Sequence, residues 1–62
     1  MNDKIELQKM DARIKAMRAS AEELKSMAED FPALYRNTSR ALASIKMLEL
    51  NLSDLMDEGL LP

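Results

Sequence analysis

The chain contains no cysteine, no histidine and no tryptophan among its 62 residues. A disulfide framework is therefore excluded, and so are catalytic or metal-binding arrangements that depend on a thiolate or an imidazole. Tyrosine and phenylalanine occur once each, which leaves few rings for stacking on nucleic-acid bases. Serine is present without a histidine base, and the chain has no glycine-rich phosphate loop. We therefore expect a protein that is not an enzyme and that uses no cofactor.

Glycine and proline are almost absent, with one glycine and two prolines. Gly59 and Pro62 lie near the C-terminus, so Pro32 alone interrupts the rest of the chain. Net charge is −2, from nine basic and eleven acidic residues, a balance that does not favour nucleic acid. No apolar run approaches the roughly 20 residues of a membrane span. Residues 1–4 lead directly into an amphipathic segment without a signal peptide, so we expect a cytoplasmic protein without a membrane partner.

Two apolar stripes with alternating spacings of three and four residues lie on either side of Pro32. Such spacing places each stripe along one side of a helix, as in a coiled coil. Except for Thr38, which lies in the second stripe, their residues are the predicted oligomer core: Leu7, Met10, Ile14, Met17, Ala21, Leu24, Ala28, Phe31, Leu34, Ala41, Ile45, Leu48, Leu52 and Leu55.

The two stripes are out of phase across Pro32, which favours a turn over one long kinked helix. We predict an all-α fold, a single domain over residues 1–62, with one helix of about residues 3–30 and a second of about 32–58. Pro32 suits the first position of a helix because its missing N–H is not needed there. A later start of the second helix near Asn37 stays open. Gly59 is the expected stop.

The predicted helices have similar lengths, so they can pair side by side as an antiparallel hairpin. Charge agrees, because Asp54 and Asp57 would lie beside Lys4 and Lys9. Asp11 and Lys15 are spaced for an ion pair within the first helix.

Further apolar residues widen the stripes. We expect a hairpin to bury one stripe per helix and to leave a second row exposed, and the candidates for a second interface are Met27, Tyr35, Leu42 and Met56. A helix with two apolar sides has two neighbours, so we predict that two hairpins form a homodimeric four-helix bundle. Chains of this size commonly need such association to bury enough surface. Met47 and Leu50 point elsewhere and are candidates for a partner surface or simple exposed residues.

Residues 24–35 carry a short motif with the order Leu-Lys-Ser-Met-Ala-Glu-Asp-Phe-Pro-Ala-Leu-Tyr. This segment resembles the Leu-His-Asp-Leu-Ala-Glu-Asp-Leu-Pro-x-x-Trp stretch of the Rop-like small helical hairpins encoded in nitrogen-fixation gene clusters. The resemblance implies a cytoplasmic, oligomeric hairpin with an accessory role in nitrogen fixation. Lys25 and Ser26 replace the His-Asp pair, so a metal-binding role of that pair is not carried over.

The function predicted from these features is a non-enzymatic protein-interaction or assembly module. One alternative is an RNA-binding hairpin dimer, with basic patches formed by Lys9, Arg13, Arg36 and Arg40. Another is an accessory factor that binds metal weakly through carboxylates, for which no specific metal residues are predicted.

Overall fold

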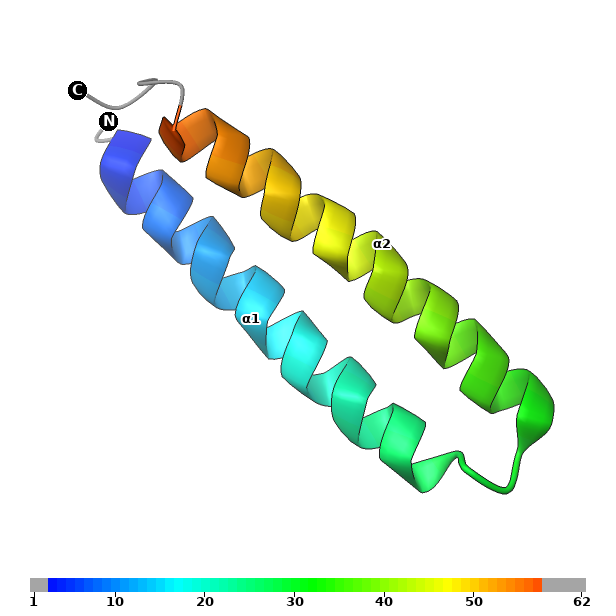
Figure 1. Cartoon of the computed structure of the whole chain (residues 1–62). Helices are drawn as coiled ribbons and strands as arrows, with labels where there is room; N and C mark the ends of the chain where they lie inside the picture. Colours follow the sequence, from blue (N-terminus) through cyan, green and yellow to red (C-terminus); the bar gives the residue numbers. More distant parts are fainter. Residues whose placement is uncertain (1–2, 58–62) are drawn as a thin grey trace.

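The computed structural model describes residues 3–57, which form two antiparallel helices joined by a tight turn (Figure 1). Helix α1 spans Asp3–Met27 and helix α2 spans Pro32–Asp57. They lie side by side along their length, in a body of 47 × 16 × 12 Å that is one helix deep. The predicted all-α hairpin is confirmed, whereas its dimerisation stays a prediction. Neither helix within residues 3–57 is long and apolar enough to cross a membrane.

The turn between the helices is built from backbone hydrogen bonds around Pro32. The Phe31 N–H donates to the Ala28 carbonyl over 2.9 Å, and the Phe31 carbonyl accepts from the Tyr35 N–H over 2.8 Å. Phe31 thus accepts the first hydrogen bond of α2, and Pro32 occupies the first helical position, where it loses no bond. The predicted start at Pro32 is confirmed over the later start near Asn37.

Helix α1 ends three residues earlier than expected. The predicted end near Asp30 is wrong, because the Ala28 N–H bonds back to the Lys25 carbonyl over 3.2 Å and tightens the last turn. The predicted stop of the second helix at Gly59 lies outside the described residues. Asp11 and Lys15 form the expected pair within α1, with Nζ 2.9 Å from Oδ2.

The helices meet along an inner row whose members recur every seven residues. We define the inner row as Leu7, Ile14 and Ala21 on α1, Ala28 in the turn directly after it, and Thr38, Ile45 and Leu52 on α2. Leu7, Ala28, Ile45 and Leu52 are the buried apolar residues of the described chain, and no large side chain in residues 3–57 is fully enclosed. The core of the single hairpin is therefore thin.

Thr38 is the polar member of the inner row and is 5% exposed. Its hydroxyl donates to the Leu34 carbonyl one turn earlier, over 2.7 Å. This bond within α2 satisfies the hydroxyl, so Thr38 is buried without an unpaired polar atom.

The expectation that the hairpin itself buries the whole of each predicted stripe is wrong. Alternate members are left exposed: Leu24 of the first stripe and Leu48 of the second are 42% and 41% exposed. Leu42, expected in the wet second row, is instead half-buried. The cause is the rotation of the helices, which face each other between the inner row and the row that holds Leu42. One neighbour per helix cannot cover both sides of the inner row.

The position of the inner row predicts that alanine substitutions of two aliphatic residues of α2 change the free energy of unfolding by different amounts. Ile45→Ala removes a side chain that is 5% exposed, so it should lower the free energy of unfolding by about 2–4 kcal/mol. Leu50→Ala, at a residue 46% exposed, should change it by roughly 0.5 kcal/mol or less. Urea unfolding followed by circular dichroism at one protein concentration measures both. Equal losses would contradict the assignment of the core.

Candidate interaction face

The exposed members of the two predicted stripes form one apolar side of the hairpin. We call this the apolar face; it consists of Met10, Met17, Leu24 and Phe31 on the first half of the chain and Leu34, Ala41, Leu48 and Leu55 on α2. Its seven large side chains are between 40% and 61% exposed. No member carries a charge or a hydrogen-bonding group, so this face can interact only by burying apolar surface.

Helix geometry places these residues on the same side of the molecule. Except for Leu34, which lies seven residues before Ala41, each member lies three residues after a member of the inner row, as Met17 follows Ile14 and Leu48 follows Ile45. When antiparallel helices face each other along their inner rows, equal offsets in the same direction fall on the same side. A shallow hollow on this side runs mainly along α1, where Met17 and Leu24 line it together with Arg13 and Ser20, and it reaches Ile45 of α2.

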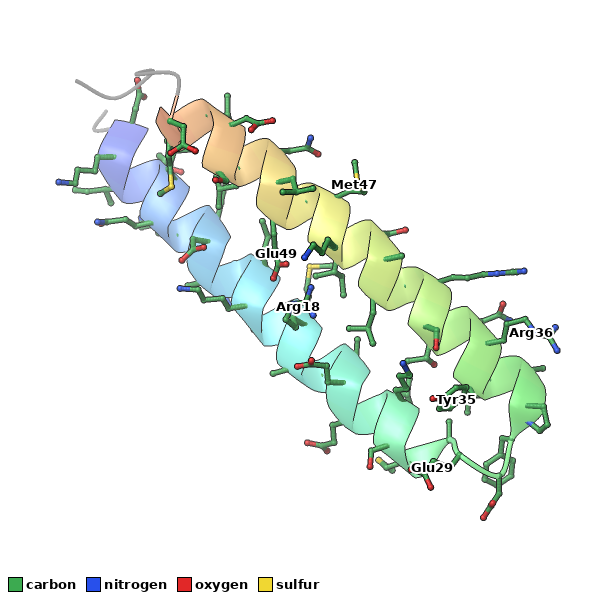
Figure 2. All side chains as sticks on the ribbon, viewed as in Figure 1. Arg18, Glu29, Tyr35, Arg36, Met47 and Glu49 are labelled. Atoms are coloured by element: carbon green, nitrogen blue, oxygen red, sulfur yellow. The ribbon has the colours of Figure 1, made fainter. Side chains whose placement is uncertain are left out.

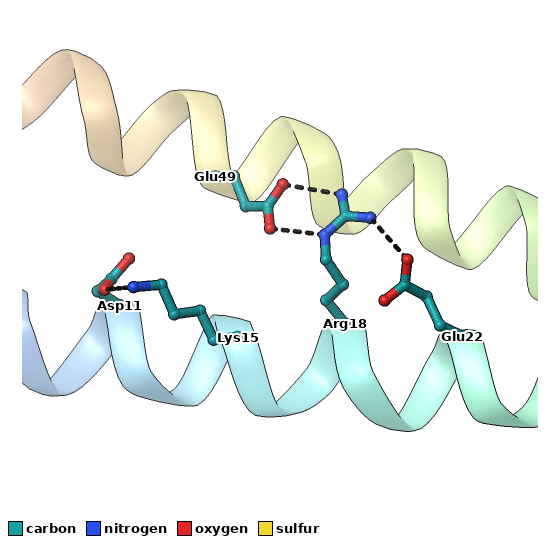
Figure 3. Close-up of polar contacts among 5 residues, drawn as sticks. All are labelled: Asp11, Lys15, Arg18, Glu22 and Glu49. Carbon is teal, nitrogen blue, oxygen red and sulfur yellow. Dashed lines mark hydrogen bonds and ion pairs between the residues drawn. The ribbon is translucent and has the colours of Figure 1, made fainter.

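The opposite side of the hairpin carries a bidentate ion pair between the helices (Figure 3). Arg18 Nε lies 2.7 Å from Glu49 Oε2, and Arg18 Nη2 lies 2.8 Å from Glu49 Oε1. Arg18 Nη1 is also 3.7 Å from Glu22 Oε2, one turn along α1. Arg18 and Glu49 each lie four residues after a member of the inner row. We call this side the ion-pair face.

The ion pair shifts the protonation equilibria of both groups. The hydrogen bond from Arg18, assisted by its charge, holds the pKa of Glu49 below the ordinary value of 4.5, against a smaller opposing effect of desolvation. The same hydrogen bond raises the pKa of Arg18, so the guanidinium stays charged at any pH that the folded chain encounters. Both charges are therefore fixed at neutral pH.

A second contact joins the helices on the ion-pair face close to the turn. Lys25 Nζ lies 5.2 Å from the centre of the Tyr35 ring, within the range of a cation–π contact. Tyr35 lies seven residues before Leu42, which itself lies seven residues before Glu49. Lys25 lies seven residues after Arg18. The two contacts together align the same pair of rows.

Three of the four second-interface candidates lie on the ion-pair face. Tyr35 and Met56 are each 39% exposed, and Leu42 is half-buried between them. Met27, the fourth, lies at a different position and is 68% exposed near the turn. The structure thus brings Tyr35, Leu42 and Met56 together but interrupts their row with Glu49.

The two partner-surface candidates lie away from both faces. Met47 is 56% exposed and Leu50 46% exposed, and Figure 2 shows Met47 pointing away from α1. They share neither the inner row nor the apolar face. They therefore provide natural controls for the role of the apolar face.

Sequence reasoning missed the Arg18–Glu49 pair. Arg40, named above for the RNA-binding alternative, has its Nη1 3.4 Å from Asn37 Oδ1 on its own helix. A signal for the missed pair was present: Arg18 and Glu49 have opposite charges and both lie four residues after an inner-row position. Only the facing of the helices shows that these positions meet.

Across residues 3–57, no group of three or more acidic side chains is gathered closely enough to hold a metal ion.

The lowered pKa of Glu49 gives a pH dependence with a definite sign. Because its pKa is lower in the folded chain, the carboxylate stabilises the fold above the ordinary value of 4.5, and this contribution is lost as the pH falls through the folded pKa. The free energy of unfolding of the parent should therefore decrease below about pH 4.5 more than that of Glu49→Gln. Urea unfolding between pH 7 and pH 3 measures this, and parallel pH profiles would contradict the pairing.

Comparison with protein-family models, with curated proteins and with solved structures gives no match for this chain.

Proposed function

We propose that this chain is a non-enzymatic assembly module that works as a homodimer, two hairpins packing apolar face against apolar face. The observation that carries the proposal is the exposure of seven large apolar side chains on one side of a hairpin that buries only four apolar residues within positions 3–57. A hairpin one helix deep cannot cover that side itself. A second layer of helices would convert the thin core into that of a four-helix bundle.

The way each helix is rotated about its own axis supports a four-helix bundle over an isolated two-helix hairpin. In a two-stranded coiled coil both members of each stripe point at the single partner helix. Here the inner row points at the neighbouring helix and the apolar face points to the side, as each helix of a four-helix bundle does toward its two neighbours. Met17 and Leu48 are thus oriented toward the place where a second hairpin would lie.

The size of the apolar face suits a stable dimer. Its seven large side chains leave on the order of 600 Å² uncovered on one copy, at the upper end of the patches found on monomers. Two copies would together bury about 1,200 Å², the lower end of the range for specific protein interfaces. A second copy therefore accounts for the whole face.

The rim of the apolar face is compatible with self-association. On the outer side it is formed by Glu6, Arg13, Ser20, Met27, Asn37, Ser44 and Asn51. Glu6 and Arg13 have opposite signs, and the α2 part of this rim is uncharged. A two-fold dimer brings the same surface of each copy together, so a rim with little charge of one sign avoids repulsion.

The setting implied by the resemblance is an accessory role in nitrogen fixation, and we retain it as part of the proposal. The matched residues also have structural roles here: Ala28 is 1% exposed, Pro32 begins α2 and Leu24 belongs to the apolar face. They support a shared hairpin architecture, while the biological process is supported by the motif alone.

RNA binding is the weaker alternative. The ring of Tyr35 is engaged by Lys25, and Arg40 is directed to Asn37. Neither contact favours a base-stacking surface, whereas the apolar face directly favours a protein partner.

Glutamate substitutions on two residues of α2 test the dimer. Leu48→Glu places a charge in the middle of the apolar face, and burying it would cost several kcal/mol, so the dimer dissociation constant should rise at least roughly 100-fold. Leu50→Glu, at a residue of similar exposure outside that face, should leave it within about threefold. Sedimentation equilibrium measures both constants.

The parent should sediment at twice the 7.0 kDa mass of the chain at micromolar concentration. A helical parent that sediments as a monomer, or a Leu50→Glu variant that dissociates as readily as Leu48→Glu, would contradict the proposal.

A further inference from the structure

On α2 the ion-pair face contains an apolar row that one residue interrupts: Tyr35, Leu42, Glu49 and Met56, each seven residues from the next. The facing row on α1 consists of the charged residues Asp11, Arg18 and Lys25. Tyr35 and Met56 are 39% exposed, close to the 40% and 41% of Leu55 and Leu48 on the apolar face. With an apolar residue at position 49, α2 would present one apolar row on each side of the inner row.

A hairpin with an apolar, self-associating face on each side would form assemblies larger than a dimer. A self-complementary face closes a dimer, but a second such face on the other side allows each dimer to add further hairpins. Stacking through both faces would therefore give larger or open assemblies. A chain that works as a dimer needs some feature that keeps the second side in water.

We propose that the Arg18–Glu49 pair is the specificity element that confines self-association to the apolar face. This inference rests on the proposed dimer and identifies the residues that limit it. The pair lies between the two helices at the middle of the hairpin (Figures 2 and 3). Helix geometry places it on the opposite side of the inner row from Met17 and Leu48. The pair places two full charges in the centre of the row where a second interface would form.

The cost of covering the pair explains the selectivity. The side chains of Arg18 and Glu49 are 31% and 34% exposed, so water still solvates both groups. A second copy laid over them would remove that water, and the attraction between buried charges often fails to offset such desolvation. The apolar face carries no comparable cost, because its members have no polar groups.

A role in specificity also fits the small energy expected of this pair. Ion pairs that remain partly exposed contribute little to stability, with a median of about 0–1 kcal/mol. A single polar position within an otherwise apolar row can nonetheless fix the number of helices in an assembly, as in coiled coils. The main effect of Arg18 and Glu49 is therefore to prevent association through the ion-pair face.

Paired substitutions separate polarity from charge. In Arg18→Leu/Glu49→Leu the centre of the ion-pair face becomes apolar while Asp11 and Lys25 stay charged, and the weight-average mass in sedimentation should rise above that of the parent dimer. Arg18→Gln/Glu49→Gln removes both charges but keeps polar groups, so its mass should equal that of the parent. Circular dichroism verifies that each variant is helical. Arg18→Met/Glu49→Met repeats the test with a more adaptable side chain should the leucine variant lose its helices.

The matched control adds the same two leucines elsewhere. Glu23→Leu/Arg36→Leu removes one acidic and one basic residue from the outer surface, where both are exposed, and should leave the mass at that of the parent. A helical variant with apolar residues at positions 18 and 49 and an unchanged mass would overturn the inference, as would an equal increase in the control. A monomeric parent would instead overturn the proposed dimer on which the inference rests.

Discussion

Each helix of this two-helix hairpin has a single neighbour, which buries the inner row and half-buries the row of Arg18 and Glu49 but does not cover the other side of the inner row. Every other feature of this structure depends on that constraint. The inner row is used for the contact between α1 and α2, so the apolar face must remain uncovered on a body only 12 Å deep. Because burial of apolar surface is the main favourable contribution to folding, a hairpin that buries only four apolar residues in its described part gains most from adding a second layer.

The two sides of the inner row differ in chemistry, and this difference makes one side of the hairpin more suitable for association than the other. On one side lie Met17, Leu24 and Leu48, whose side chains have no polar groups that would lose contact with water on being covered. On the other lie Arg18 and Glu49, whose bidentate contact is best satisfied while water still reaches it. The ion pair therefore aligns the helices and disfavours association on its own side, while the apolar face favours association on the other.

The fold could be predicted from the sequence because its determinants are local. Heptad spacing places each stripe on one helix side, and Pro32 defines the turn and the start of α2. The sequence does not determine how each helix is rotated toward the other, because residues on either side of an inner-row position are equally able to contact the neighbouring helix. Met17 and Arg18 are adjacent in sequence, yet one lies on the apolar face and the other pairs with Glu49. Spacing alone therefore identified the residues of the candidate interface but assigned Leu24 and Leu48 to the interior of the single hairpin.

The native methionines allow the most direct test of the central claim, that a second copy covers the apolar face. Carbon-13 methyl labelling of methionine, with a soluble paramagnetic agent added, reports how closely solvent approaches each methyl group. Met17 and Met47 are 48% and 56% exposed in the single hairpin, so a lone hairpin would show both strongly relaxed. A dimer packed through the apolar face predicts that Met17 is shielded and Met47 is not. Equal relaxation of the two methyl groups at micromolar concentration would contradict it.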